Sequence, residues 1–224
     1  MSRDTRVKIC CIASVEEALT AVDAGAQAIG LVGDMPSGPG IIDDDLARKI
    51  ATSLPPGVES FLLTSRDRAG DIVDHLRHCC TTTVQIVKPI DPAEHERIKD
   101  ALPDVKRVQV VHVEGEDCLE FSDVYESLVD EFLLDSGRPG ARIAELGGTG
   151  RVHDWNISKR FVRNSRKPVY LAGGLSPGNV SEAIRKVRPQ GVDVCSGVRS
   201  EGRLNAERLK QFRTAVGSRA ALCG

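Results

Sequence analysis

The sequence predicts an α/β protein that folds as a single (β/α)8 TIM barrel over residues 1–224. Short apolar runs rich in valine and isoleucine alternate with segments of helical periodicity, and this alternation occurs eight times. Glycines and polar residues gather after the C-terminal ends of the predicted strands, as barrels of this class require. A doubly wound open sheet is the competing architecture, but the count of eight units favours the barrel. No linker or shift in composition marks a second domain.

The first predicted unit joins a strand at 7–13 to an amphipathic helix. Ser14 and Glu17 have the spacing of a capping box, which predicts that this helix begins after Ser14. Four apolar residues then predict one face of the helix: Val15, Ala18, Leu19 and Val22. The next three strands are expected at 28–33, 59–65 and 82–88. Their helices are expected at 43–53, around Ile72, Val73 and Leu76, and from Pro92 to Leu102.

The second half of the chain repeats the pattern. Strands are expected at 106–113, 131–136, 168–172 and 191–196. Helices are expected at about 119–129 and 156–164, over the apolar face of Val180, Ala183, Ile184 and Val187, and around Leu209, Phe212 and Val216. Asn179 and Glu182 again have cap spacing. A glycine-rich loop at 147–150 precedes the sixth helix.

Composition excludes several classes of function. The net charge of −2 and an aromatic content of 4% argue against a nucleic-acid partner. No apolar run of about 18 residues exists, so no membrane span is predicted. The 7 cysteines are odd in number and include two adjacent pairs, which is a poor disulfide framework and predicts a cytoplasmic protein. The oligomeric state is left open between monomer and homodimer.

Strand alternation assigns side chains to the two faces of the barrel wall. On the first strand it turns Lys8, Cys10 and Ile12 inward, and it turns Ile9, Cys11 and Ala13 toward the helices. On the sixth strand it turns Asp135 inward, with Phe132 and Leu134 outward. On the eighth it turns Asp193 and Cys195 inward. Because an unpaired buried ammonium is costly, Asp193 is the expected partner of Lys8.

Two titratable residues at strand ends are the candidate catalytic groups. Asp135 ends an apolar strand at the predicted barrel mouth, a place where carboxylates usually serve chemistry. Cys10 ends another strand, and a thiol near cations or backbone N–H groups can act as a base. The alternative for Cys10 is a small buried apolar residue. Our interpretation is an acid/base pair at the mouth.

A phosphate site is predicted beside this pair. Barrels commonly bind phosphate with the loops after strands seven and eight, where backbone N–H groups face the anion. Here those loops contain Gly173 and Gly174, then Ser196 and Gly197. Glycines at both places permit close approach of the backbone. A phosphorylated small molecule is therefore the expected partner.

These residues together resemble the phosphoribosylanthranilate isomerases of tryptophan biosynthesis. The matching pieces are Val7-Lys-Ile-Cys10, Ala24–Gly30, Val84-Gln85, Leu133–Asp135, Gly147–Gly150 with Asp154-Trp155, Leu171–Leu175 with Pro177, Asn179 and Val180, and Val192-Asp-Val with Ser196-Gly-Val198. The resemblance implies an isomerase that performs an Amadori rearrangement of an aminoaldose to an aminoketose. It implies Asp135 as general acid on the furanose ring oxygen and Cys10 thiolate as general base at C2. It implies neither a metal nor an organic cofactor.

The chain departs from the family pattern at the end that holds the amine. Cys11 replaces the glycine of Lys-Ile-Cys-Gly. The loop at 36–39 lacks the arginine of Ser-Pro-Arg, which in the family binds the anthranilate carboxylate. Val87-Lys88 replaces His-Gly, and Arg199 replaces a glutamate. Arg66, Lys88 and Arg199 are candidate substitutes for the missing cation. The substrate-binding candidates are Lys8, Arg66, Gln85, Lys88, Asp193 and Arg199.

Three hypotheses of function follow. The first is a phosphoribosylanthranilate isomerase with altered carboxylate recognition, and the second is the same chemistry on a different phosphoribosylamine. The third is a non-catalytic phosphosugar-binding barrel, which would need neither Cys10 nor Asp135. A histidine-pathway isomerase is disfavoured because that chemistry uses two aspartates. His75, His78, Cys79 and Cys80 cluster without a second ligand set, so no metal site is predicted. His112 and His153 are expected to line the mouth or to pack there.

Overall fold

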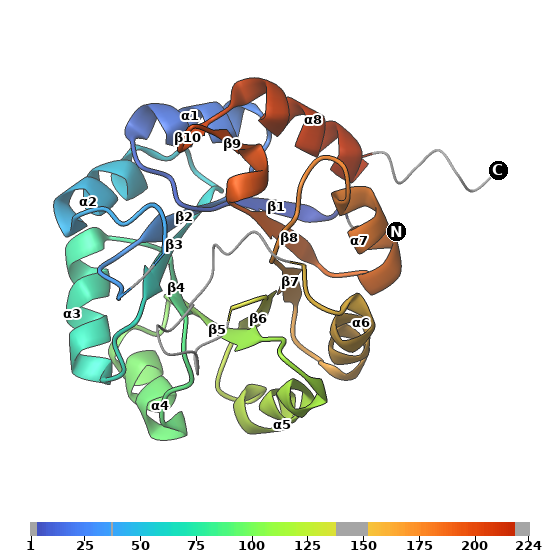
Figure 1. Cartoon of the computed structure of the whole chain (residues 1–224). Coiled ribbons are helices and arrows are strands. Elements are labelled where there is room, and N and C mark those ends of the chain that lie inside the picture. The colour runs from blue at the N-terminus through green and yellow to red at the C-terminus, as the bar shows by residue number, and fades with distance from the viewer. Residues whose placement is uncertain (1–3, 37, 138–151, 218–224) are drawn as a thin grey trace.

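Eight parallel strands close on themselves in the computed structural model, which describes residues 4–36, 38–137 and 152–217. They are β1 (Arg6–Ile9), β2 (Ala28–Val32), β3 (Glu59–Thr64), β4 (Thr83–Ile86), β5 (Lys106–His112), β6 (Glu131–Asp135), β7 (Val169–Leu171) and β8 (Gly191–Val194). Each strand pairs with the next, and β8 pairs with β1, which completes the ring (Figure 1). The predicted barrel is confirmed, and the pairing of β8 with β1 excludes an open sheet.

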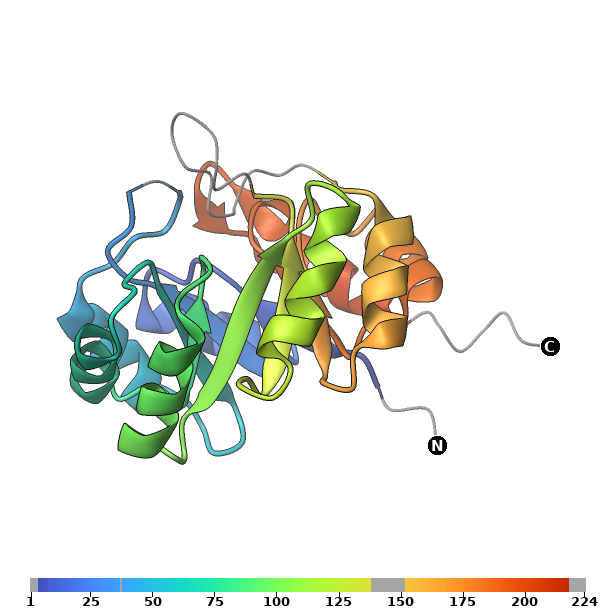
Figure 2. The same cartoon turned by 90° about the horizontal axis from the view of Figure 1, so that it is seen from below.

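A ring of helices surrounds the strands (Figure 1). The helices are α1 (Val15–Asp23), α2 (Asp44–Ser53), α3 (Ala69–Cys79), α4 (Pro92–Ala101), α5 (Glu120–Tyr125), α6 (Trp155–Asn164), α7 (Val180–Val187) and α8 (Ala206–Gly217), with short 3-10 turns η1 (Glu116–Leu119) and η2 (Ser196–Val198). A side view shows the loop after β2 and the segment after β8 at one end of the barrel, opposite the start of β1 (Figure 2). None of the described helices is long and apolar enough to cross a membrane.

Two apolar clusters reflect the alternation of side chains in the strands. The outer cluster lies between strands and helices and includes Phe132, Leu134, Val192 and Val194. The inner cluster fills the barrel and includes Phe61, Leu133 and Tyr170. The predicted faces of β6 and β8 are therefore confirmed. Because the interior is packed with side chains, the chemistry is confined to the rim.

The predicted faces are wrong beyond Cys10, where β1 has already ended. Cys11 has a φ of 60°, in the left-handed region, and this breaks the period of two. Cys11 consequently joins the inner cluster, whereas Ile12 joins the outer one. The strand predicted at 7–13 was too long, because side-chain alternation does not show that Cys11 has a left-handed backbone conformation.

Helix caps match the sequence in one place and differ in another. Ser14 Oγ accepts a hydrogen bond from Glu17 N at 3.1 Å, which confirms the predicted start of α1 after Ser14, whereas Glu17 Oε2 accepts from Ala13 N and not from the Ser14 N–H that a capping box uses. Asn179 makes no cap bond to α7. Its side chain instead accepts from Ser176 N at 2.8 Å and donates to Gly174 O at 2.9 Å. The predicted cap position is confirmed, since Asn179 directly precedes α7, but its side chain fastens the preceding loop and does not bond to the first turn.

Three smaller differences concern exposed or irregular segments. Leu19, expected on the buried face of α1, is 42% exposed. The helix expected at 119–129 is divided between η1 and the short α5. After β8 the chain forms an antiparallel hairpin of β9 (Arg199–Ser200) and β10 (Arg203–Leu204), which was not predicted. The loop at 147–150 lies outside the described residues.

Candidate active site at the barrel mouth

Asp135 and Cys10 both lie at the C-terminal rim of the barrel. Asp135 is the last residue of β6, and Cys10 directly follows β1. Because all eight strands are parallel, their C-terminal ends share one rim. Cys10 is 5% exposed and belongs to the inner cluster. Asp135 keeps partial contact with solvent, as a group that exchanges protons with a substrate must.

The environment of Asp135 favours its protonated form. Burial among protein atoms raises the pKa of this carboxyl above its ordinary value, although the Ser136 N–H, which donates to Oδ1 at 2.7 Å, opposes the shift. His112 is the cross-strand neighbour of Asp135, and its Nε2 lies 2.8 Å from Val87 O. A carboxyl of raised pKa keeps its proton to higher pH, which suits a general acid.

Lys8 and Asp193 form a buried ion pair inside the barrel. Lys8 Nζ lies 2.9 Å from Asp193 Oδ2, and the Lys8 side chain is fully buried. Burial alone would lower the pKa of Lys8, but the Asp193 carboxylate and the neighbouring thiols raise it above its ordinary value. The pairing predicted from strand alternation is confirmed. It places a permanent positive charge close to the thiol of Cys10.

Gly30 makes room for this group and was missed at the level of sequence. A Cβ atom on Gly30 would lie 2.8 Å from Cys10 Sγ and 3.1 Å from Lys8 Nζ. Any larger residue at this position of β2 would therefore push into the Cys10 thiol and the Lys8–Asp193 ion pair. A glycine inside an otherwise apolar strand is the signal that could have revealed it, since such glycines mark close approach of another group.

The predicted phosphate loops lie side by side. A Cβ atom on Gly197 would lie 2.0 Å from Leu175 O, so the loop after β8 packs directly against the loop after β7. Gly173 and Gly174 have φ values of 81° and 63°, which favour glycine. His153 contacts this loop, since its Nδ1 would lie 3.0 Å from a Cβ on Gly173. The structure thus brings together the two loops that carry the four predicted residues.

His153 itself takes a packing position in this loop region. Its Nε2 lies 2.7 Å from Ser158 Oγ, and burial lowers the pKa of His153 to about 4. The ring is therefore neutral at pH 7 and adds no positive charge beside the glycines.

The three candidate cations each have a partner. Arg199 pairs with Glu17 at 3.1 Å and also donates to Cys11 O. Lys88 lies 3.1 Å from an Asp67 carboxylate oxygen, and its side chain is 35% exposed. Arg66 donates to the backbone O of Asp71 at 2.9 Å and is also partly exposed.

Gln85 offers a free hydrogen-bonding group inside the barrel. It is 4% exposed, and its Oε1 is buried without a hydrogen-bond partner among the described residues. Its strand neighbours Val84 and Ile86 belong to the outer cluster, so Gln85 faces inward. A buried amide oxygen without a partner is costly, which is typical of a group that a ligand completes.

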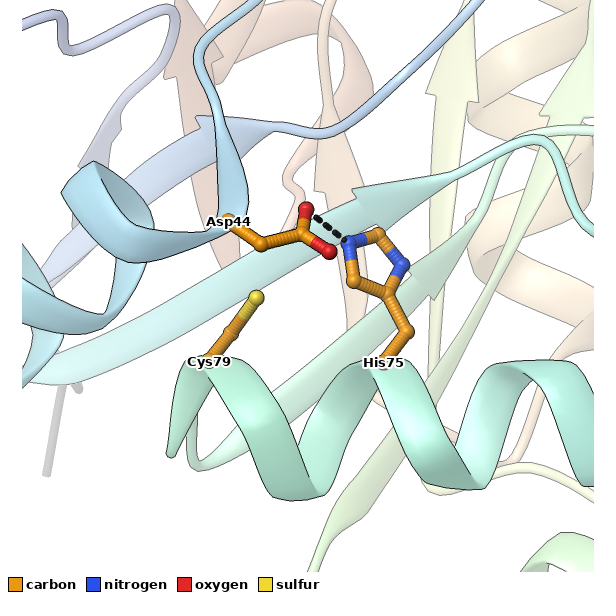
Figure 3. Close-up of side chains that lie close together, drawn as sticks. All are labelled: Asp44, His75 and Cys79. Carbon is orange, nitrogen blue, oxygen red and sulfur yellow. Dashed lines mark hydrogen bonds and ion pairs between the residues drawn. The ribbon is translucent and has the colours of Figure 1, made fainter.

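A second titratable cluster lies between α2 and α3 (Figure 3). His75 Nε2 lies 2.9 Å from Asp44 Oδ1, and the ligand atoms of Asp44, His75 and Cys79 all lie within 4.8 Å of one another. Burial lowers the pKa of His75 and raises the pKa of the Cys79 thiol to about 12. A neutral imidazole that donates to Asp44 and a protonated thiol account for the contact, and the expectation of no metal here stays a prediction.

Replacing His75 with alanine should lower the free energy of unfolding by about 2–3 kcal/mol, because it removes a buried ring and leaves Asp44 without this donor. His78 is the matched control, since it makes the same type of contact to Asp45 at 2.9 Å but is 48% exposed. His78→Ala should change the value by less than about 0.5 kcal/mol. Urea unfolding followed by circular dichroism measures both. Equal losses in the two variants would contradict this role for His75.

The chain matches a known protein family over nearly its whole length. The family model described as N-(5'phosphoribosyl)anthranilate (PRA) isomerase matches residues 7–215. The chain is 41% identical over 205 residues to an N-(5'-phosphoribosyl)anthranilate isomerase of Methanocella arvoryzae, which covers 92% of this chain and 94% of that protein.

Solved structures of isomerases with this name share the fold of the chain. A phosphoribosyl anthranilate isomerase from Thermus thermophilus superposes with a TM-score of 0.82 at 26% identity, over 96% of this chain and 99% of that one. Another isomerase of this name was solved in complex with reduced 1-(o-carboxyphenylamino)-1-deoxyribulose 5-phosphate. It superposes with a TM-score of 0.76 at 28% identity over the same shares of the two chains.

Proposed function

The chain belongs to the N-(5′-phosphoribosyl)anthranilate isomerase family, and from this premise we propose that Asp135 and Cys10 catalyse an Amadori rearrangement in tryptophan biosynthesis. The substrate is an N-(5-phosphoribosyl)amine and the product a 1-amino-1-deoxyribulose 5-phosphate. The observation that carries the proposal is the carboxyl of Asp135, held at the rim of this family's barrel with a pKa raised by burial. A carboxyl in that state can give a proton to a sugar oxygen.

The proposed reaction has three steps. Asp135 protonates the furanose ring oxygen, and the ring opens as the amine nitrogen forms a double bond to C1. The Cys10 thiolate then removes the proton from C2, which gives an enolamine. The enolamine becomes the ketone when C1 gains a proton and the C2 hydroxyl loses one. Atoms and charge balance without an oxidant or a cofactor, and the buried ammonium of Lys8 supports negative charge on the nearby thiol.

The two glycine loops are proposed to hold the phosphate. Gly173, Gly174 and Gly197 present backbone without side chains, and Ser196 adds an exposed hydroxyl. The relative solved with a phosphorylated product analogue has the same fold over nearly all of this chain, which supports a phosphorylated ligand here. Binding at this end would position the sugar between the acid and the base.

The amine end is proposed to be recognised by groups at the ends of β3 and β4. Gln85 has an unpartnered buried oxygen, and Lys88 and Arg66 are only partly covered. Arg199 is the least available of the candidate cations because Glu17 and the Cys11 carbonyl already hold it. The absence of an arginine in the loop at 36–39 supports a second candidate function, the same rearrangement on a phosphoribosylamine with another amine.

Complementation tests the first candidate against the second. The chain is expressed in a tryptophan auxotroph that lacks this isomerase, beside the Cys10→Ala and Asp135→Ala variants. We expect growth without tryptophan from the unaltered chain and none from the two variants. No growth from a well-expressed, folded protein would remove anthranilate as the amine. Turnover of another phosphoribosylamine by the purified protein would then establish the second candidate, and binding without any turnover would favour a phosphosugar-binding protein.

A further inference from the structure

Three thiols gather where β1 and β8 end, and the proposed reaction uses only one of them. Cys10 and Cys11 follow β1, and Cys195 follows β8. The two strands are hydrogen-bonded neighbours, with Ile9 opposite Val194. The backbone N–H of Cys10 continues this ladder and donates to Val194 O at 2.9 Å. The fold therefore places Cys195 directly beside the adjacent pair of cysteines.

Cys11 connects the other two thiols. Cys10 and Cys11 belong to the inner cluster, Cys195 packs against it, and the Cys11 thiol interacts with the thiols of both other residues. The left-handed backbone of Cys11 turns its side chain into the barrel mouth, where a regular strand would have turned it toward the helices. L residues rarely adopt this conformation, and glycine would adopt it without strain. The chain nevertheless carries a thiol at this position, in contact with a second thiol that no catalytic step needs.

The contacts make Cys195 the more reactive member of this second pair. The neighbouring Cys11 thiol and the positive charge of the Arg199 guanidinium lower the pKa of Cys195 below its ordinary value. Cys195 is also partly exposed, whereas Cys11 is 5% exposed. The neighbouring thiols of Cys10 and Cys195, together with burial, raise the pKa of Cys11. A partly exposed thiol of lowered pKa beside a buried thiol of raised pKa is the arrangement of a redox-sensitive cysteine and its resolving partner.

We propose that Cys195 and Cys11 are an oxidation site, at which a peroxide converts the two thiols into a reversible disulfide. The Cys195 thiolate attacks one oxygen of the peroxide, forms a sulfenic acid and releases the other oxygen as water. The Cys11 sulfur then attacks the sulfenic sulfur, the S–S bond forms, and a second water leaves. Two thiols lose two electrons in total, and the peroxide gains them.

The bond is compatible with a closed barrel. Disulfides join Cα atoms about 4.4–6.8 Å apart, and neighbouring strands lie about 4.8 Å apart. The effect on catalysis rests on the proposed function. Oxidation turns the Cys11 sulfur from the Cys10 thiol toward Cys195. It also removes the thiolate that faces Arg199, which itself donates to the carbonyls of both Cys10 and Cys11. The backbone that carries the base would shift, and the isomerase would be switched off.

Peptide mapping tests the bond independently of activity. The reduced protein is treated with a small excess of hydrogen peroxide, free thiols are blocked with iodoacetamide, and tryptic peptides are sequenced by mass spectrometry. We expect a crosslinked pair that joins Cys11 to Cys195 and lacks two hydrogens, and we expect it to disappear with dithiothreitol. Isomerase activity should fall at least tenfold and return on reduction. If the chain proves to have no isomerase activity, the crosslink alone decides this proposal.

Three variants make the test specific. Cys80→Ser is the control, since Cys80 is an exposed thiol at the end of α3, and it should leave the crosslink unchanged. Cys195→Ser should abolish the crosslink. After treatment with peroxide it should retain its isomerase activity, whereas the unaltered protein loses most of its own. Cys11→Ser should leave a sulfenic acid on Cys195 that dimedone captures. A bond between Cys10 and Cys11, or equal inactivation of Cys195→Ser through oxidation of Cys10, would overturn the proposal.

Discussion

Asp135→Asn should lower kcat roughly 10²–10⁴-fold, the range over which a positioned general acid contributes. Asparagine has nearly the same shape, and its amide oxygen can still accept the Ser136 N–H that now lies 2.7 Å from Asp135 Oδ1. It has no proton to give to the ring oxygen, so ring opening loses its acid while the binding of the phosphate end is retained. We therefore expect kcat to fall and KM to change by less than about threefold, because the lost interaction belongs to the transition state.

Asp130→Asn is the matched control for this variant. Asp130 precedes β6 at the other end of the same strand, where its carboxylate pairs with Arg107 at 3.1 Å. Its replacement should leave kcat unchanged while it removes a surface-facing ion pair. Steady-state assays of product formation, with far-UV circular dichroism to confirm folding, measure both variants. A loss of less than tenfold in Asp135→Asn would take the acid role away from this residue.

If Asp135 is the general acid, kcat should depend on pH. The reaction needs Asp135 protonated, and burial raises the pKa of its carboxyl. The protonated fraction falls as pH rises through that raised value, so the alkaline limb of the kcat profile should lie above the ordinary range of an aspartic acid. In Asp135→Asn this limb should be absent from the residual activity.

Periodic patterns were sufficient to predict the barrel and much of its interior. Lys8 and Asp193 are far apart in the chain, yet side-chain alternation on two strands predicted that both point inward. The cost of an unpaired buried charge then predicted that they form an ion pair. The structure has this pair at 2.9 Å. The same reasoning failed one residue beyond the strand, because the φ of 60° at Cys11 belongs to a single residue and has no period.

The partners of the polar side chains were the part that residue spacing could not predict. Asn179 has the spacing of a helix cap, but its side chain bonds to the loop directly before it, at Ser176 N and Gly174 O. Arg199 was one of three candidate substitutes for the missing cation of the family. The β9–β10 hairpin instead places it against Glu17 and the carbonyls of Cys10 and Cys11. The strand positions of the site were thus predictable, whereas the availability of its surrounding charges was not.

Lys8→Met should lower the free energy of unfolding by about 3–5 kcal/mol, the loss typical of breaking a buried ion pair from one side. Methionine fills most of the volume of the lysine stem, so little of the lost stability would come from packing. Most of it would come from the Asp193 carboxylate, which would be buried without a partner. That carboxylate is 7% exposed and would lose its partner at 2.9 Å. Chemical unfolding of the variant and of the unaltered chain at pH 7 measures the difference.

The dependence on pH separates an unpaired charge from a packing defect. Without Lys8, burial should raise the pKa of Asp193 further, while the unfolded chain would ionise it near the ordinary value of about 4. When the pKa of an acidic group is higher in the folded chain than in the unfolded chain, the free energy of unfolding falls as pH rises between the two values. The deficit of Lys8→Met should therefore be larger at pH 8 than at pH 5. The double variant Lys8→Met/Asp193→Leu removes both charges and should recover most of the stability, since replacing a buried pair with apolar residues is often neutral. A deficit that is equal at both pH values and persists in the double variant would show that Lys8 acts through packing alone.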